Sequence, residues 1–288
     1  MEGTHLDMKN KTVLLSGGTS GVGKATAIGL ASRGAKVIIL SRSGENGKQA
    51  LLDIANATGN NQGELLISDL SLQSSIRETC AEFKRKYDRL DVLAHLGGAI
   101  YWEKLITKEG IERMFAVNVL SHFLLTQELL DMLKESRPSR VITVAGNPRF
   151  LKKPHIDFED IQLLNHFSGM RAATQTMNAR ILLAFEWAKH LEGTGVASVA
   201  FHPGWVKSKL TRHSPWYLRM MAPFMNARAG DDCKPGVYAA SAMEIAEANG
   251  AFLDDKMHIL PIRHNYDIEA GPKLWRVCEE LTSGQWAD

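Results

Sequence analysis

Short apolar runs alternate with segments of helical periodicity along most of this 288-residue chain. The runs are rich in Val, Ile and Leu with little polar alternation, which is typical of strands covered on both faces. They predict strands at residues 12–16, 36–41, 64–68, 90–95, 140–145 and 196–201, with a weaker seventh near 257–260. This alternation predicts an α/β fold, a doubly wound parallel sheet of about seven strands with helices on both faces.

Helical patterns occupy the segments between the predicted strands. The expected helices are residues 22–33, 72–87, 108–134 and 170–192. No proline- or glycine-rich linker, low-complexity tract or internal repeat interrupts the pattern. A single domain over residues 1–288 is therefore the simplest organisation.

Two long segments depart from the alternation, residues 146–168 and 207–232. Both would leave the carboxyl ends of strands, where sheets of this kind bind ligands. The second is rich in methionine and aromatic residues, which suits a lid over an apolar substrate pocket. A surface helix packed on the body and a contact with a membrane surface are the alternatives for the same composition.

The composition excludes several classes of function. Lys and Arg number 34 against 32 Asp and Glu, so no electrostatic feature favours a nucleic-acid partner. The cysteines at 80, 233 and 278 are far apart and odd in number, which predicts neither a disulfide framework nor a metal site. A reducing, cytoplasmic location is expected. No apolar run of about 18 residues occurs, so no membrane span is expected.

A glycine-rich turn follows the first predicted strand and leads into the first helix. It reads Ser16-Gly17-Gly18-Thr19-Ser20-Gly21-Val22-Gly23. Glycines permit a tight turn and close approach of backbone amides to a pyrophosphate, and the helix N-terminus adds partial positive charge. Any strand–helix turn favours glycine, but this position at the start of the chain favours a dinucleotide-binding Rossmann fold.

The end of the second predicted strand indicates which dinucleotide is bound. An NAD enzyme carries an acidic residue there for the ribose diol. This chain has Ser41-Arg42-Ser43 instead. An arginine suits a 2′-phosphate, so NADP(H) is the expected cofactor, with a solvated surface arginine as the alternative.

The chain resembles the short-chain dehydrogenase/reductase superfamily, nearest to its retinol-dehydrogenase-like branch, over nearly its whole length. Further motifs in family positions are Asp69-Leu70, Leu90-Asp91-Val92-Leu93, Asn118 within a helical segment, and His202-Pro203-Gly204-Trp205-Val206-Lys207-Ser208. The expected cofactor contacts are Gly17, Thr19, Ser20, Gly21, Val22, Gly23, Ser41, Arg42, Ser43, Asp69, Leu70, Leu96, Gly97, Gly98, Asn118, Pro203, Gly204, Val206 and Ser208. The resemblance also implies a small-molecule substrate and a homo-oligomer.

The family's catalytic serine, tyrosine and lysine are replaced. The serine position holds Gly146, and counting back from His202 without gaps places Ala173 on the tyrosine and Met177 on the lysine. Residues 154–188 contain neither tyrosine nor lysine, so no shift of alignment restores the motif. A missing general acid typically costs 10²–10⁴ in rate, which argues against ordinary alcohol or ketone chemistry.

Three interpretations remain open. The first is an enzyme with non-standard catalysis on a small, largely apolar substrate, and the same scaffold also suits a non-redox reaction. The second is an inactive NADP(H)-binding sensor, and the third is a scaffold with an empty dinucleotide fold.

The catalytic candidates for the enzyme interpretation are His95, Tyr101 and Asn118. His122, Asn147 and Arg149 belong to the same end of the site. His95 would face the cofactor and Tyr101 would supply a phenol. Each also has a structural interpretation: a satisfied buried histidine, loop packing beside Trp102, and a helix kink at Asn118.

Overall fold

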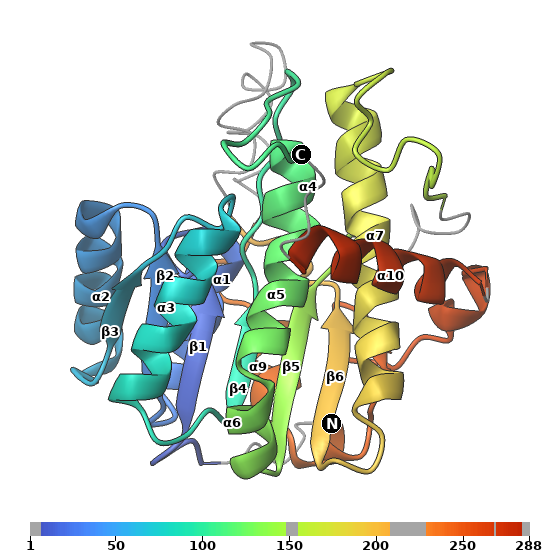
Figure 1. The fold of residues 1–288 in the computed structure, drawn as a ribbon. Coiled ribbons are helices and arrows are strands. Elements are labelled where there is room, and N and C mark those ends of the chain that lie inside the picture. The colour runs from blue at the N-terminus through green and yellow to red at the C-terminus, as the bar shows by residue number, and fades with distance from the viewer. Residues whose placement is uncertain (1–6, 148–154, 208–228, 268, 284–288) are drawn as a thin grey trace.

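A computed structural model describes residues 7–147, 155–207, 229–267 and 269–283 of the chain. Seven parallel strands form one sheet in the order β3-β2-β1-β4-β5-β6-β7 (Figure 1). The strands are β1 (Thr12–Ser16), β2 (Lys36–Ser41), β3 (Glu64–Ile67), β4 (Val92–His95), β5 (Ser139–Val144), β6 (Val196–Phe201) and β7 (Phe252–Leu253). The order reverses between β1 and β4, as in a doubly wound sheet that binds its ligand at this switch point.

Helices cover both faces of the sheet (Figure 1). They are α1 (Gly21–Ala31), α2 (Gly44–Thr58), α3 (Gln73–Lys86), α4 (Arg113–Phe115), α5 (Ser121–Glu128), α6 (Leu130–Glu135), α7 (Gly169–His190), α9 (Lys234–Ser241) and α10 (Ala270–Thr282). A π-helical turn, η1 (Ala116–Leu120), joins α4 to α5. One core lies between the sheet and the layer of α3, α5 and α7, and a second lies under α1, α2 and α9.

The sheet is built as its sequence predicts, because the central strands are apolar on both faces. All five residues of β1 and all six of β6 are buried. The register pairs Leu14 with Ile38 on one side and with Leu93 on the other. Strand bounds follow the prediction within two residues for the first six strands.

The seventh strand was predicted at the wrong residues. It is Phe252–Leu253, which pairs in parallel with β6. The predicted segment, 257–260, instead makes an isolated antiparallel bridge between Ile259 and Leu253. The apolar run at 257–260 thus turns back beside β7 and is not itself the seventh strand.

The helix predicted at 108–134 is also divided. Its regular part begins only at Arg113, because the Glu112 carboxylate accepts hydrogen bonds from the amides of Met114 and Phe115 as an N-cap. The π-helical turn then places Asn118 at its centre. Such turns occur frequently at functional sites, so this irregularity draws attention to Asn118.

Helix α10 crosses α7 on the outside of its layer (Figure 1). Trp275 of α10 packs with its ring centroid 4.7 Å from Trp187 of α7 and 4.9 Å from Phe123 of α5. This aromatic cluster packs α10 and α5 against α7, the helix that carries Ala173 and Met177. Among the helices of the described ranges, none is long and apolar enough to cross a membrane.

Candidate functional site at the carboxyl edge of the sheet

The glycine-rich turn packs backbone against backbone with the end of β4. Gly17 has a φ of +81°, and a Cβ added there would lie 2.4 Å from the Cα of Gly97. A Cβ on Gly23 would lie 2.1 Å from the carbonyl oxygen of Gly17. Side chains at either position would fill the turn above the N-terminus of α1. The side-chain-free cradle beside unpaired helix amides fits a dinucleotide pyrophosphate.

The turn after β2 leaves an arginine exposed beside this cradle. Ser41 Oγ donates to the Ser43 carbonyl oxygen over 2.9 Å, and Ser43 Oγ accepts from the amide of Asn46 over 3.2 Å as the N-cap of α2. The two serine hydroxyls therefore close the turn itself. Arg42 between them is exposed and has no hydrogen bond or ion pair to the described residues, so its guanidinium is available to a ligand.

Asp69 and Leu70, two of the expected cofactor contacts, follow β3 at the carboxyl edge of the sheet. The Asp69 carboxylate accepts from the Ser71 amide over 2.9 Å and from the Ser71 hydroxyl over 2.8 Å. Both Asp69 and Leu70 are half-buried. The carboxylate thus fixes its own turn, and this turn lies at the same sheet edge as Arg42.

The segment after β6 has the predicted motif, and its final residue, Ser208, lies outside the described residues. Val206 forms a parallel bridge with Gly230. The Lys207 amide donates to the Gly230 carbonyl oxygen over 3.1 Å, and the Gly230 amide donates to the Trp205 carbonyl oxygen over 2.8 Å. Pro203 and Gly204 are half-buried at the sheet edge. Of the predicted lid, 207–232, only residues 207 and 229–232 are described.

The position of His95 differs from the one predicted. Its ring is 1% exposed, is hydrogen-bonded through Nε2 to Thr126 Oγ1 over 2.8 Å, and stacks on His122 with centroids 4.4 Å apart. Burial, with a smaller contribution from the charge of Arg180, lowers the pKa of His95 to about 3. A neutral, enclosed ring is a poor proton donor near neutrality, so this environment favours the structural interpretation of His95.

Tyr101 lies on the loop after β4 and packs beside the start of α7. It packs against a cluster of buried residues that includes Ala173 and Met114. The guanidinium carbon of Arg113 lies 5.1 Å from the centroid of the Tyr101 ring. The structure thus brings together the Tyr101 phenol, the Arg113 guanidinium and Ala173 of α7.

Asn118 is fixed by hydrogen bonds from both ends of its side-chain amide. Its Oδ1 accepts from the Ala99 amide over 2.9 Å, and its Nδ2 donates to the Ala99 carbonyl oxygen over 2.9 Å. Nδ2 also lies 3.2 Å from Thr176 Oγ1 on α7. Asn118 therefore joins the π-helical turn to α7 and to the loop after β4.

The positions assigned to the family serine and lysine lie in contact. A Cβ on Gly146 would lie 3.0 Å from the Sδ of Met177. Ala173, one turn before Met177 on α7, is buried in the apolar cluster beside Tyr101. Asn147 is half-buried next to Gly146, and Arg149 lies outside the described residues. Gly146, Ala173 and Met177 thus form an apolar surface without a titratable side chain at these three positions.

The sequence analysis missed Arg180, which reaches the same region. Its side chain is buried, with hydrogen bonds to the carbonyl oxygens of Gly97 and Asn118 and to Asn118 Oδ1. Arg180 directly precedes the apolar run Ile181-Leu182-Leu183, and this was the sequence signal that its side chain is buried. An arginine is seldom buried unless its guanidinium has partners.

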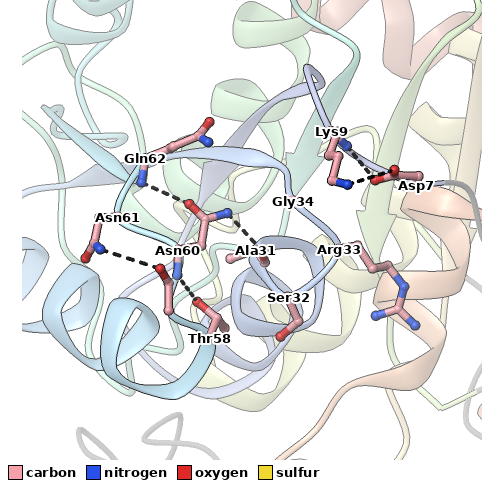
Figure 2. Close-up of a pocket in the computed structure, with 11 residues that line it drawn as sticks. Asp7, Lys9, Ala31, Ser32, Arg33, Gly34, Thr58, Asn60, Asn61 and Gln62 are labelled. Atoms are coloured by element: carbon pink, nitrogen blue, oxygen red, sulfur yellow. Dashed lines mark hydrogen bonds and ion pairs between the residues drawn. The ribbon is translucent and has the colours of Figure 1, made fainter.

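A separate hollow of about 870 Å³ lies at the opposite, amino edge of the sheet (Figure 2). The segments 31–34 after α1 and 58–62 after α2 line it, together with Asp7 and Lys9. Asn60 bonds to the carbonyl oxygens of Ala31 and Ala35 and so uses the acceptors at the end of α1. This hollow is distinct from the candidate site.

Comparisons with known proteins agree with this geometry. A family model described as short chain dehydrogenase matches residues 11–156. Retinol dehydrogenase 12 of Mus musculus is 33% identical, with 98% of this chain and 90% of the relative covered. Dehydrogenase/reductase SDR family member 13 of Bos taurus is 37% identical, with coverage of 95% and 74%.

Solved structures give the same fold. An uncharacterised protein from Mycobacterium paratuberculosis has a TM-score of 0.74 and 26% identity, with 99% of this chain and 98% of that chain covered. The complex of Pseudomonas aeruginosa RhlG with NADP has a TM-score of 0.65 and 22% identity, with coverage of 86% and 95%.

Proposed function

Because this chain belongs to the short-chain dehydrogenase family, we propose that it binds NADP(H) at the carboxyl edge of its sheet and acts on a small, largely apolar substrate with non-standard catalysis. The observation that carries this proposal is the side-chain-free cradle of Gly17, Gly23 and Gly97. Exposed Arg42 lies at the end of the strand next to β1, where a 2′-phosphate would reach it.

NADPH, when bound, would supply hydride. The chain's own residues would bind the cofactor, orient the substrate and provide the proton. We assign the proton to the Tyr101 hydroxyl, because its ring packs at the cluster around Ala173 and faces the Arg113 guanidinium. Asn118 would hold the loop after β4 in place through its two bonds to Ala99. Gly146, Ala173 and Met177 would form an apolar floor.

The substrate class follows from relatives named retinol dehydrogenases and from the apolar composition of residues 207–232. A long, conjugated aldehyde such as retinal is therefore the first compound to test. The second candidate function is an NADP(H)-binding sensor without turnover. The observation that favours it is the absence of an acidic or basic side chain at positions 146, 173 and 177.

Replacing Arg42 should separate the two cofactors. We expect Arg42→Ala to weaken NADPH binding by at least about tenfold, because a charge-assisted bond to the 2′-phosphate is lost, and to leave NADH binding unchanged. Energy transfer from tryptophan to the reduced nicotinamide measures both affinities. Arg85→Ala removes an exposed arginine near the end of α3 and is the matched control. Equal losses for both cofactors would remove the assignment of Arg42.

Replacing Tyr101 should test catalysis separately from binding. With retinal and NADPH, we expect Tyr101→Phe to lower turnover by about 100-fold, the usual contribution of a general acid, while NADPH affinity is retained. Tyr238→Phe is the control. The Tyr238 hydroxyl on α9 donates to the Glu244 carboxylate on η4 (Met243–Ala246), away from the site. Unchanged turnover in Tyr101→Phe contradicts the role of Tyr101. NADPH binding by the wild type without turnover of any carbonyl compound supports the sensor.

A further inference from the structure

Arg180 places a buried positive charge between α7, β4 and the π-helical turn. The residue is 7% exposed. Its Nε donates to the Asn118 carbonyl oxygen over 3.0 Å, and its Nη2 donates over 2.9 Å both to the Gly97 carbonyl oxygen and to Asn118 Oδ1. All three acceptors are neutral oxygens, so these bonds orient the guanidinium without neutralising it.

Arg180 forms no ion pair with a carboxylate of the described residues, so its charge is not compensated by them. Burial lowers the pKa of Arg180 to about 10, so the side chain still carries its charge near neutrality. A buried cation without a counter-charge is costly to a fold. A polar or anionic ligand that bonds to it would therefore recover part of this cost.

The guanidinium lies directly under exposed backbone at the carboxyl edge. A Cβ on Gly98 would lie 2.4 Å from Nη2 and 3.1 Å from Nη1 of Arg180. Gly98 itself is exposed. Only a residue without a side chain leaves room for the arginine at this point, and Nη1 has no acceptor among the described residues. The unused donor therefore sits at the cofactor edge of the sheet.

Arg180 also lies on the same helix as the position that has lost its lysine. Met177 is three residues earlier on α7, so the two side chains leave neighbouring points of one helix face. The Met177 thioether contacts the serine position, Gly146, and carries no charge. A cation is therefore still present in this part of the site, one turn further along α7.

We infer that Arg180 is a binding residue for the nicotinamide half of the cofactor, with Nη1 donating to a hydroxyl oxygen of the nicotinamide ribose. This inference rests on the proposed NADP(H) site. It gives the unused donor of the buried guanidinium, reaching under Gly98, a ligand oxygen to bind.

The test compares two ligands that share the adenosine half. NADPH contains both halves, whereas adenosine 2′,5′-bisphosphate contains only the half next to Arg42. We expect Arg180→Met to weaken NADPH binding by about tenfold or more and to change binding of the bisphosphate by less than about twofold, as measured by titration calorimetry. Arg180→Lys keeps the charge and should recover part of the NADPH affinity.

Arg140 on β5 is the matched control for the loss of a buried arginine. It is 4% exposed and donates to the carbonyl oxygens of Ala239 and Ala242, at the amino end of its strand. Arg140→Met should leave the ratio of the two affinities unchanged. An unchanged ratio in Arg180→Met would overturn the inference. Failure of wild-type protein to bind NADPH would instead overturn the proposed function.

Discussion

Acidification from pH 6.5 to pH 5 should destabilise the folded chain by about 3 kcal/mol through His95 and His122. Both rings are buried, and burial lowers the pKa of His95 to about 3 and that of His122 well below its ordinary value. The folded state therefore excludes protons that the unfolded chain takes up below its pKa of about 6.5. Each histidine then costs about 1.4 kcal/mol for each pH unit below that value, and the stability is fully present above it.

Urea unfolding at several pH values measures this dependence, and His122→Phe isolates it. His122 is buried and stacks on His95, and burial is the main cause of its lowered pKa. Phenylalanine keeps a ring in the stack but cannot take up a proton. We expect about half of the slope between pH 6.5 and pH 5 to disappear in this variant. The same slope in the variant and in the wild type would show that His122 is accessible to protons in the folded state.

Asp91→Ala should lower the free energy of unfolding by about 2 kcal/mol or more, because it leaves the buried Thr12 amide without its acceptor and removes the carboxylate that pairs with Lys11 and Arg89. The Asp91 carboxylate accepts from the Thr12 amide over 2.9 Å, from Lys11 Nζ over 2.9 Å, and from Arg89 Nε over 2.8 Å. Its side chain is 4% exposed. These bonds tie β4 to the start of β1, so their loss affects the centre of the sheet.

The control for this variant is Asp53→Ala, which removes a half-buried pair with Lys24 at the surface of α1 and α2. Water replaces the lost partner there, so a much smaller change is expected. The pKa of Asp91 adds a second check. Burial alone would raise it, but Arg89, the Thr12 amide and Lys11 together lower it. Its contribution is therefore present above the ordinary carboxyl pKa and is lost as the pH falls further, in a window below that of the histidines. Equal destabilisation by the two alanine variants would contradict this account.

The sheet was predictable because its strands are buried on both faces. A strand such as Thr12–Ser16 is then a largely apolar run without polar alternation, so only its two ends have to be predicted. The seventh strand is two residues long, and a longer apolar run follows it at 257–260, so pattern alone selects the wrong segment. The break before Arg113 depends on the N-cap bonds of Glu112, which periodicity does not reveal.

The glycines of the turn after β1 could be singled out from the sequence for a different reason. Glycines at 17 and 23 are required by backbone contacts within one turn and with Gly97, so they leave a local trace in the sequence. The direction of the His95 ring depends on Thr126 and His122, which lie on another element. The position of Arg180 depends on Gly98 and Asn118 in the same way. These contacts join residues that are far apart in the sequence, so they can be identified only from the packing of the helices on the sheet.

The bridge between Val206 and Gly230 has a consequence for how this protein could change its substrate over evolutionary time. It holds both ends of the intervening chain together on the body of the protein. The entropy of closing such a loop depends only weakly on length, at about 0.6 kcal/mol for each doubling. Changes in the length of the chain between the two anchors should therefore cost the fold little. If residues 207–232 cover the substrate as proposed, insertions and deletions there could alter substrate specificity at little cost to the Rossmann body.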